Sequence, residues 1–549
     1  MVYYRLKALR MGTPTVTLQA TTESIASAVL IRSGNSEPPL FLTHCAAGQL
    51  LYADRLARQF DLQIPVYGLP PVPPGGSILR TVEGMATRMV RLIRRIQPLG
   101  PYRIAGWSFG GILAYEIAMQ LLGADLTVDF VGLIDTPYPG VHDEPLNQDA
   151  TPGLKHHAAS PPPETASPQA NSAQDGWLSH HPNIYFQAAH DYFLRPLPAS
   201  VHFFGTDDCS QDYQAWTGAL GEDHIKLVPV PGTYDTIISS PIITILGPLV
   251  ANAIQNIRSP LERTSEQRRS PVIPLTTRST GTRLLLCVPG AGANVACFRE
   301  LTASLDSTWL IYGFQPRGLD AQLIPHATIE SCAELCVKKL EHLYPIYPTH
   351  ILGHSLGGWI ALETAHRLTE AGCAVSSLTL IDTDIPDENQ TTIREYTYTE
   401  IVLAWIRLAE THFGKPLDIT MQDLQSLMHD DQRRLLHARL VSIGAISRHS
   451  DPDILKGSLT TFAAGVRIHY TPEATYPGRA RLVVAEQALP GLDDNRPETT
   501  TRIDKWRKWI PGLIPMKSPA SHPTLLRSPH VQVIARALED DPAAEQYTL

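Results

Sequence analysis

Two copies of one short motif carry the residues best suited to chemistry. The pattern Gly-x-Ser-x-Gly occurs at residues 106–110, around Ser108, and again at residues 353–357, around Ser355. Between a buried strand and a helix, this pattern forms a sharp turn that exposes the serine hydroxyl at the start of the helix. A glycine-rich helix start without chemistry is the alternative. The apolar run before each copy and the helical pattern after it favour a nucleophilic serine.

A serine needs two partners to act as a nucleophile near neutral pH. A histidine accepts its proton, and a carboxylate holds that histidine in the right tautomer. Where this turn is used, the order along the chain is serine, aspartate, histidine. After Ser355 the chain offers Asp382, at the end of an apolar run, and His522, in a loop before the last helical pattern. Ser355, Asp382 and His522 are the predicted catalytic set, although His522 could also be an ordinary exposed loop residue.

The first copy of the motif lacks the base. Ser108 is followed by Asp135, but the position where histidine is expected holds Tyr234. A phenol with a pKa of about 10 cannot replace a histidine with a pKa of about 6.5. Loss of the base costs on the order of a thousandfold or more in rate. His224 lies upstream, at the wrong end of the preceding strand, and the histidine pairs at 156–157 and 180–181 are weak substitutes. We expect an impaired first copy.

The same chemistry requires backbone N–H groups that stabilise a negatively charged oxygen. One group belongs to the residue after the serine, which is Phe109 or Leu356. The other comes from a loop of small residues after the first apolar strand, and this points to Ala46 in the first copy and Gly290 in the second. The alternative is that Ala46 and Gly290 are turn residues only.

The elements that must position these residues are repeated as well. Each half contains an apolar strand, a second short strand, an amphipathic helix, the serine motif and an apolar strand that ends in aspartate. The interval from serine to aspartate is 27 residues in both halves, which indicates a tandem duplication. Short apolar strands that alternate with helical patterns indicate βαβ units, and the predicted fold class is therefore α/β with mainly parallel sheets.

The predicted organisation follows from the repeat. It consists of an N-terminal tail (1–25), a first domain (26–257), a polar linker (258–270), a second domain (271–540) and a C-terminal tail (541–549). The second domain is expected to begin with an edge strand near residues 271–275. Residues 140–182 hold many of the prolines and show no hydrophobic period, so we expect a loop or disorder there.

Composition narrows the class of protein. The chain has 549 residues, of which 43% are hydrophobic and 18% charged, and this favours a packed globular protein. The net charge of −9 argues against nucleic acid or an anionic membrane as a partner. No apolar stretch is long enough to predict a membrane span, and no secretory signal is expected. Seven scattered cysteines without a Cys-x-x-Cys pair indicate a reduced, cytoplasmic chain.

The series of motifs resembles the thioesterase domains that end nonribosomal peptide and polyketide synthetases, arranged here in tandem. The resemblance covers residues 26–257 and 271–540, nearly the whole chain. The motifs that carry it are residues 40–48, 106–111 and Asp135 in the first half, and residues 289–292, 353–358, Asp382, 469–472 and 521–526 in the second.

This resemblance implies two α/β-hydrolase domains, each with a lid insertion, and a definite reaction. An acyl or peptidyl chain is transferred from the phosphopantetheine of a carrier protein to the serine, and water or an internal nucleophile then releases it. No metal and no cofactor is expected, and the partners are carrier protein domains. The lid of the second domain would span residues 386–468, whereas the lid of the first is replaced by the proline-rich stretch.

Two other functions fit the same residues. The set in the second domain also suits a general carboxylesterase or lipase, because the same groups cleave oxygen esters. The first domain could instead be a non-catalytic module that docks a carrier protein, since it departs from the family pattern both at Tyr234 and in its reduced lid.

Overall fold

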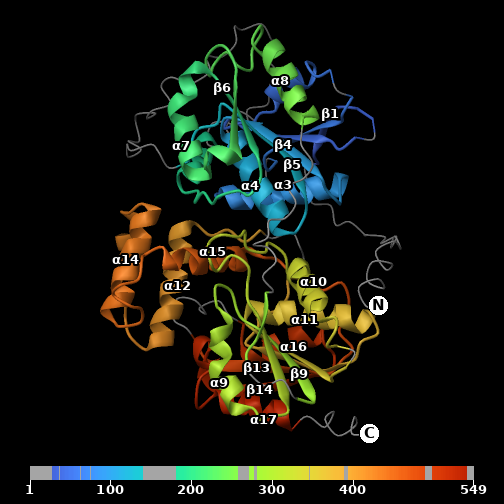
Figure 1. Cartoon of the computed structure of the whole chain (residues 1–549), viewed down its shortest axis with the longest axis vertical. Helices are drawn as coiled ribbons and strands as arrows, with labels where there is room; N and C mark the ends of the chain where they lie inside the picture. The colour runs from blue at the N-terminus through green and yellow to red at the C-terminus, as the bar shows by residue number, and fades with distance from the viewer. Residues whose placement is uncertain are drawn as a thin grey trace. The chain divides into compact units, whose positions relative to one another are not determined.

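The computed structural model describes residues 27–139 (without 36, 62 and 74–75), 181–256, 271–276 and 281–540 (without 345, 389–392 and 489–496). The predicted tails, the linker 258–270 and residues 140–180 of the predicted loop lie outside the described residues. The described residues form two compact units, one within residues 19–265 and one within residues 266–549 (Figure 1).

The first unit is built on a seven-stranded sheet with the order β1-β3-β2-β4-β5-β6-β7. Only β1 is antiparallel to its neighbour, and the other strands are parallel. The strands are β1 (Val29–Arg32), β2 (Leu40–Thr43), β3 (Val66–Leu69), β4 (Tyr102–Trp107), β5 (Val128–Ile134), β6 (Val201–Gly205) and β7 (Ile225–Pro229). The helices are α2 (Leu51–Ala57), α3 (Val82–Ile96), α4 (Phe109–Gly123), α6 (His181–His190), α7 (Ser210–Leu220) and α8 (Ile243–Gln255), with η2 (Asp207–Cys209) and η3 (Glu222–His224) as short 3₁₀ turns.

The second unit repeats this design. Its seven-stranded sheet has the order β14-β13-β12-β11-β9-β10-β8, and only β8 is antiparallel to its neighbour. The strands are β8 (Val272–Pro274), β9 (Arg283–Val288), β10 (Trp309–Phe314), β11 (Thr349–His354), β12 (Val375–Ile381), β13 (Ala480–Gln487) and β14 (Leu513–Ser521). The helices outside the lid are α9 (Arg299–Ser304), α10 (Ile329–Leu340), α11 (Leu356–Glu370), α16 (Thr499–Arg507) and α17 (Val531–Glu539), with η5 (Val295–Phe298) and η6 (His522–Thr524) as 3₁₀ turns.

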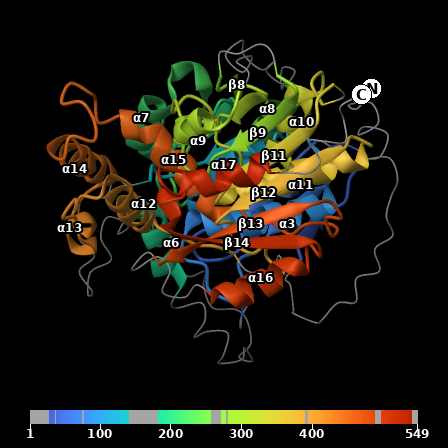
Figure 2. The ribbon, with the colours of Figure 1, turned by 90° about the horizontal axis from the view of Figure 1, so that it is seen from below.

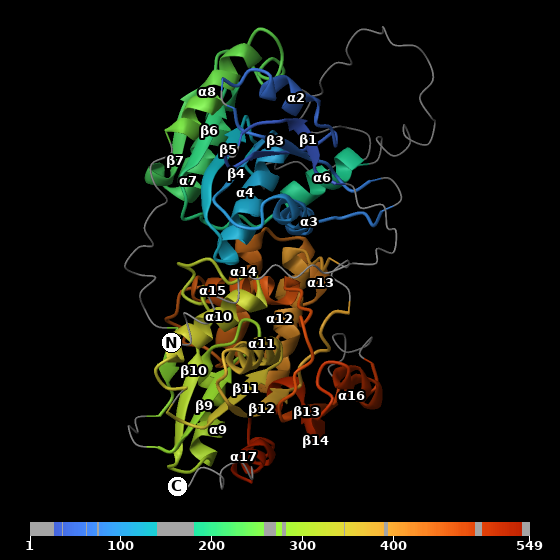
Figure 3. The ribbon, with the colours of Figure 1, turned by 90° about the vertical axis from the view of Figure 1, so that its right-hand side faces the viewer.

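Helices cover both faces of each sheet, because the central strands are apolar throughout and must be buried on both sides. In the first unit α2 and α8 pack on one face, and α3 and α4 lie on the other (Figure 3). In the second unit α9 and α17 share a core on one face, whereas α10, α11 and α16 contribute to the core of the other (Figure 2). This arrangement confirms the predicted α/β class with mainly parallel sheets.

Several predicted elements agree with the structure closely. In the first half, the expected second short strand is β3 and the expected amphipathic helix before the serine motif is α3. The expected edge strand near residues 271–275 is β8. Helix α3 begins where the Thr81 side chain accepts a hydrogen bond from the N–H of Gly84, and α10 begins in the same way at Thr328.

The lid insertion of the second unit is a group of four helices between β12 and β13. They are α12 (Tyr398–Phe413), α13 (Met421–Gln425), α14 (His429–Ser442) and α15 (Ile454–Arg467), and Figure 1 shows three of them gathered as one group in orange. A capping box of Thr397 and Glu400 starts α12, and Gly414 ends it in a left-handed conformation with φ 64°. In the first unit the described part of the corresponding connection contains α6.

Candidate active site

Both serines lie at a sharp turn between a buried strand and a helix, as their motif predicts. Ser355 has φ 54° and ψ −126°, and Ser108 has nearly the same values, φ 56° and ψ −128°. This conformation is strained for a residue with a side chain. Glycine is required nearby, because a Cβ on Gly357 would collide with the carbonyl oxygens of Val288 and Pro289. The strand before each serine and the helix after it hold the turn in place.

In the second unit, His522 and Asp382 are joined directly. The Nδ1 atom of His522 lies 2.8 Å from Oδ2 of Asp382, whose side chain is fully buried. Asp382 follows β12, His522 follows β14 and Ser355 follows β11, so all three residues stand at the carboxyl ends of parallel strands. The structure therefore brings the predicted residues to one edge of the sheet, with the histidine on the carboxylate.

His354, the residue before Ser355, supports the same histidine. Its Nε2 atom donates to the backbone carbonyl of His522 at 3.1 Å, and the two rings lie 4.7 Å apart between centroids. Burial, with a smaller contribution from His522, lowers the pKa of His354 to about 3, so its ring is neutral near neutral pH. His354 thus fixes the backbone of His522 beside the serine turn. Sequence reasoning treated this position only as the variable residue of the motif.

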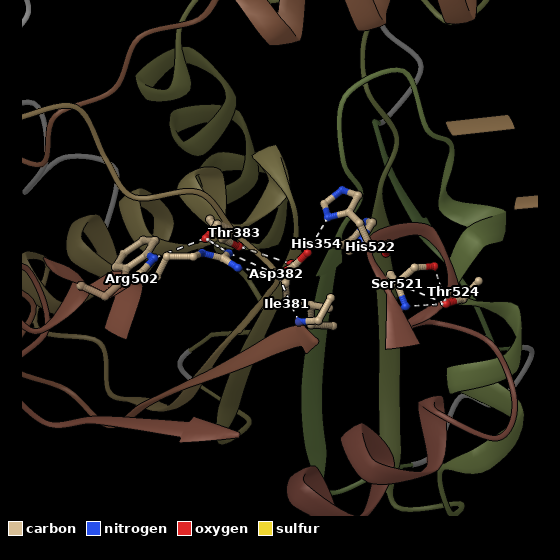
Figure 4. A network of polar contacts seen from close by, with 10 residues as sticks. His354, Ile381, Asp382, Thr383, Arg502, Ser521, His522 and Thr524 are labelled. Carbon is tan, nitrogen blue, oxygen red and sulfur yellow. Dashed lines mark hydrogen bonds and ion pairs between the residues drawn. The ribbon is translucent and has the colours of Figure 1, made fainter. Parts of the chain in front are cut away.

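Arg502 of α16 is a second residue that sequence reasoning missed. Its Nη1 and Nη2 atoms each lie 3.2 Å from Oδ1 of Asp382, and the N–H of Ala485 donates to the same oxygen at 3.2 Å. Figure 4 shows Asp382 between Arg502 on one side and the two histidines on the other. One carboxylate oxygen is therefore occupied by Arg502 and Ala485, and the other is presented to His522. No local motif announces this pairing, because 120 residues separate the two side chains.

The backbone around Ser355 leaves N–H groups available for an oxyanion. A Cβ added to Gly290 would lie 3.1 Å from the Cβ of Ser355, so the loop after β9 approaches the serine closely. Within the described ranges, the N–H groups of Gly290, Ala291 and Leu356 make no backbone hydrogen bond. Equally, no hydrogen bond joins the Ser355 hydroxyl to His522 among the described residues.

Strand register shows that the two predicted loop positions are not equivalent. Leu40 pairs with Arg103 in the first sheet, and Leu285 pairs with His350 in the second, five residues before each serine. Counted from these pairs, Ala46 corresponds to Ala291, whereas Gly290 corresponds to Cys45. The first unit therefore has a side chain at the point where the second has a glycine against its serine.

In the first unit, Tyr234 takes the place of the histidine. Val228 pairs with Phe204 and Met516 pairs with Val483, and Tyr234 and His522 follow these strand positions by the same number of residues. The Tyr234 hydroxyl donates to Oγ of Ser108 at 2.5 Å. Burial raises the pKa of Tyr234 well above its ordinary value. A phenol that stays protonated cannot accept the proton of Ser108.

The carboxylate of the first unit is bonded to a different group. Thr206 donates its N–H to Oδ1 of Asp135 at 3.0 Å and its hydroxyl to Oδ2 at 2.8 Å. Thr206 corresponds in register to Ala485, which donates only its N–H to Asp382. Thr206 thus bonds the oxygen that His522 contacts in the second unit.

His224 does not stand in for the base at Ser108. His224 ends η3, directly before β7, whereas Tyr234 comes after that strand, and this agrees with the expectation. Residues 156–157 and 180 lie outside the described residues, and His181 begins α6. The structure therefore places Tyr234 at Ser108, as the sequence predicted.

The lid of the second unit lies directly on the candidate site. Cβ atoms on Gly292 and Gly465 would approach Phe462 at 2.7 Å and Ala291 at 2.7 Å, so α15 is packed tightly onto the loop after β9. From α12, His412 receives two hydrogen bonds of 2.6 Å from Arg527, in the segment that follows η6. The lid is thus attached to both loops that form the site.

The described part of the chain holds no group of three or more His, Cys, Asp or Glu side chains arranged to bind a metal ion. None of its helices has the length and apolar character needed to cross a membrane.

Comparison with known families gives one extensive match. The model of a family described as "Thioesterase domain" matches residues 38–157 and 283–541, which together make up more than half of the chain. The match includes both serine turns, Asp382 and His522.

Three curated relatives are large synthetases. The chain is 32% identical over 141 residues to atromentin synthetase invA5 of Paxillus involutus, and 40% identical over 111 residues to vanchrobactin synthetase VabF of Vibrio anguillarum. It is 30% identical over 204 residues to a non-reducing polyketide synthase of Pseudevernia furfuracea. These matches cover 25%, 20% and 35% of this chain, but only 15%, 4% and 9% of the relatives.

Solved structures of similar chains include the wild-type Vlm2 thioesterase domain, with 21% identity and a TM-score of 0.35 over 49% of this chain and 96% of that one. Another is YbtT, a type II thioesterase from the yersiniabactin pathway, with 20% identity and a TM-score of 0.35 over 50% of this chain and 98% of that one.

Proposed function

The chain belongs to the thioesterase domain family, and on this premise we propose that its second unit is a serine thioesterase that releases an acyl or peptidyl chain from a carrier protein. The observation that carries the proposal is the 2.8 Å contact between His522 and Asp382, at the sheet edge where the strained turn exposes Ser355. The synthetases among the relatives support a substrate held as a thioester on a carrier.

The proposed reaction has two steps. His522 takes the proton of the Ser355 hydroxyl, whose oxygen forms a bond to the thioester carbonyl carbon, while N–H groups of Leu356 and Gly290 stabilise the negative oxygen. The carbon–sulfur bond then breaks, and the thiol leaves with the proton from His522. In the second step His522 takes a proton from water, or from an amine or hydroxyl of the chain itself, as this nucleophile forms a bond to the acyl carbon. The bond from that carbon to the Ser355 oxygen then breaks, and His522 returns the proton to this oxygen. Asp382 orients the imidazole and stabilises its cation throughout.

For the first unit we propose a non-catalytic role, with carrier binding as the function that remains. The bond from Tyr234 to Ser108 and the bonds from Thr206 to Asp135 support this division. In this proposal the two copies are the domains 26–257 and 271–540, joined by the linker 258–270. A cytoplasmic location is also part of the proposal, because seven scattered cysteines without a Cys-x-x-Cys pair are typical of a reduced chain.

The experiment compares Ser108→Ala with Ser355→Ala in the full chain. Hydrolysis of an acyl-carrier thioester and of octanoyl-N-acetylcysteamine is measured for both variants. We expect Ser355→Ala to lose on the order of a thousandfold or more in kcat/KM, whereas Ser108→Ala stays within about twofold of the parent. Full loss in Ser108→Ala would refute the division of labour. Cleavage of oxygen esters without activity on carrier thioesters would instead identify a general carboxylesterase.

A further inference from the structure

A buried ion pair in the second unit lies outside the predicted catalytic set. The Arg502 side chain is 3% exposed and that of Asp382 is 0% exposed. Besides its two contacts with Oδ1 of Asp382, Arg502 donates to the carbonyl oxygen of Thr383 at 3.3 Å. Trp506, one turn further along α16, donates its Nε1–H to the same carbonyl at 3.3 Å. Helix α16 therefore holds both the carboxylate of Asp382 and the backbone that follows it.

We propose that Arg502 is a positioning residue for the thioesterase reaction: it anchors Oδ1 of Asp382, so that Oδ2 alone is presented to His522. This inference rests on the function proposed for Ser355. Arg502 reaches neither the serine nor the place of the substrate, and it acts only through Asp382.

Geometry gives Arg502 the means for this role. Two N–H groups of a planar guanidinium converge on one oxygen, and the carboxylate cannot rotate without losing both bonds. A buried carboxylate whose cationic partner is removed is strongly destabilised, since no water replaces the partner. Ala485 and His522 would still contact the carboxylate, but the two guanidinium bonds that fix its orientation would be lost. The carboxylate would be free to turn, and His522 would lose its fixed orientation.

The first unit provides an internal comparison. Its aspartate, Asp135, receives both the amide and the hydroxyl of Thr206, and Tyr234 occupies the register position of His522. In the unit that pairs its aspartate with a histidine, an arginine occupies one carboxylate oxygen and leaves the other for that histidine. The arrangement around Asp382 is therefore matched to the presence of His522.

The test uses the full chain and three variants. Arg502→Gln removes the charge, and Arg502→Lys keeps it without the planar fork. Arg507→Gln is the control, because it removes a charge from the same helix at a half-exposed side chain that pairs with Asp504. Reaction of Ser355 with a fluorophosphonate, kcat and KM for hydrolysis of octanoyl-N-acetylcysteamine, and the melting temperature are measured for every variant.

For Arg502→Gln we expect kcat to fall about tenfold or more with KM nearly unchanged. Arg502→Lys should also lose kcat, since an ammonium keeps the charge but not the two converging N–H groups. Arg507→Gln should keep the kcat and KM of the parent.

The proposal is overturned if Arg502→Gln and Arg502→Lys have the kcat and KM of Arg507→Gln and differ from it only in a lower melting temperature. If Arg502→Gln does not fold, the lysine variant decides, because unchanged kcat in it would equally overturn the proposal. Failure of the fluorophosphonate to label Ser355 in the parent protein would contradict the proposed function itself. Labelling of the Arg502 variants at the rate of the parent would contradict only the role proposed for Arg502.

Discussion

Two substitutions should give the first unit the base–carboxylate pair that it lacks. Tyr234→His places an imidazole where the second unit has His522, because the two positions are equivalent in register. Alone, this change leaves the new histidine in competition with Thr206, whose hydroxyl bonds Oδ2 of Asp135 at 2.8 Å. Thr206→Ala removes that hydroxyl, keeps the N–H bond to Oδ1 and reproduces the alanine found at position 485. The double variant Thr206→Ala/Tyr234→His therefore matches the second unit at both positions.

The expected gain follows from one hydrogen bond. A bond to a charged carboxylate contributes about 1.5–3 kcal/mol, and a factor of ten corresponds to about 1.4 kcal/mol. In the single variant Tyr234→His, the new histidine reaches Oδ2 of Asp135 only after it displaces the Thr206 hydroxyl. This cost lowers the fraction of correctly oriented histidine by roughly tenfold or more. We expect the double variant to exceed Tyr234→His by about this factor in kcat/KM, and to be at least about tenfold above background.

The assay is carried out in a Ser355→Ala background, so that any hydrolysis of octanoyl-N-acetylcysteamine must come from the first unit. Labelling of Ser108 by a fluorophosphonate, identified by mass spectrometry of the peptide, is the second readout. Thr206→Ala alone is the matched control and should remain at background. Equal activity of Tyr234→His and the double variant would refute the role given to Thr206, and no activity in either would refute the claim that these two side chains silence the unit.

Two further predictions concern the serine turn and the response to pH. Gly357→Ala should lower the melting temperature markedly and abolish activity, because its Cβ would meet the carbonyl oxygens of Val288 and Pro289. Gly414→Ala is the control: its Cβ would lie in open space, but its φ of +64° is unfavourable for alanine. We therefore expect it to lower stability and leave activity unchanged. Burial lowers the pKa of His44 to about 4. The neutral ring therefore makes its full contribution to the free energy of unfolding above a pH of about 6.5. This contribution is lost at about 1.4 kcal/mol per pH unit as the pH falls towards 4. The free energy of unfolding, measured with urea at several pH values from 7 to 4, should fall less steeply with pH for His44→Phe than for the parent. Equal pH dependence in the two proteins would contradict this assignment.

The sequence predicted most of the fold because its signals were local. Apolar runs, helix caps and the Gly-x-Ser-x-Gly motif each depend on a few consecutive residues. Because the whole series occurs twice, the pattern in each half supported the interpretation of the other half. The position of Tyr234 could be predicted for the same reason, since it follows the last strand pattern by a short interval. The lid was predicted as a helical segment, but its division into four helices required the structure.

The contacts that distinguish the two sites could not be predicted in this way. Arg502 and Asp382 meet only because α16 packs beside the ends of β12 and β13, and Thr206 meets Asp135 only through the pairing of β5 with β6. The mismatch between Ala46 and Gly290 is of the same kind, because it depends on the register of strands rather than on the small residues themselves. These distances depend on which strands are neighbours in the sheet and on the register in which they pair, and a single sequence does not give this information.

The turn at Ser108 has the geometry of the turn at Ser355, although its serine accepts from a tyrosine rather than facing a histidine. The dihedral angles of the two serines differ by only a few degrees, although this conformation costs about 1–3 kcal/mol. Gly110 and Gly111 are packed so closely against Thr43 and Thr136 that a Cβ at either position would collide. Under the proposed division of labour, a duplicated domain has lost its chemistry through a few side chains while its backbone is preserved. The shape of a nucleophile turn is then a trace of ancestry, and a search for working enzymes must inspect the partners of the serine rather than the turn alone.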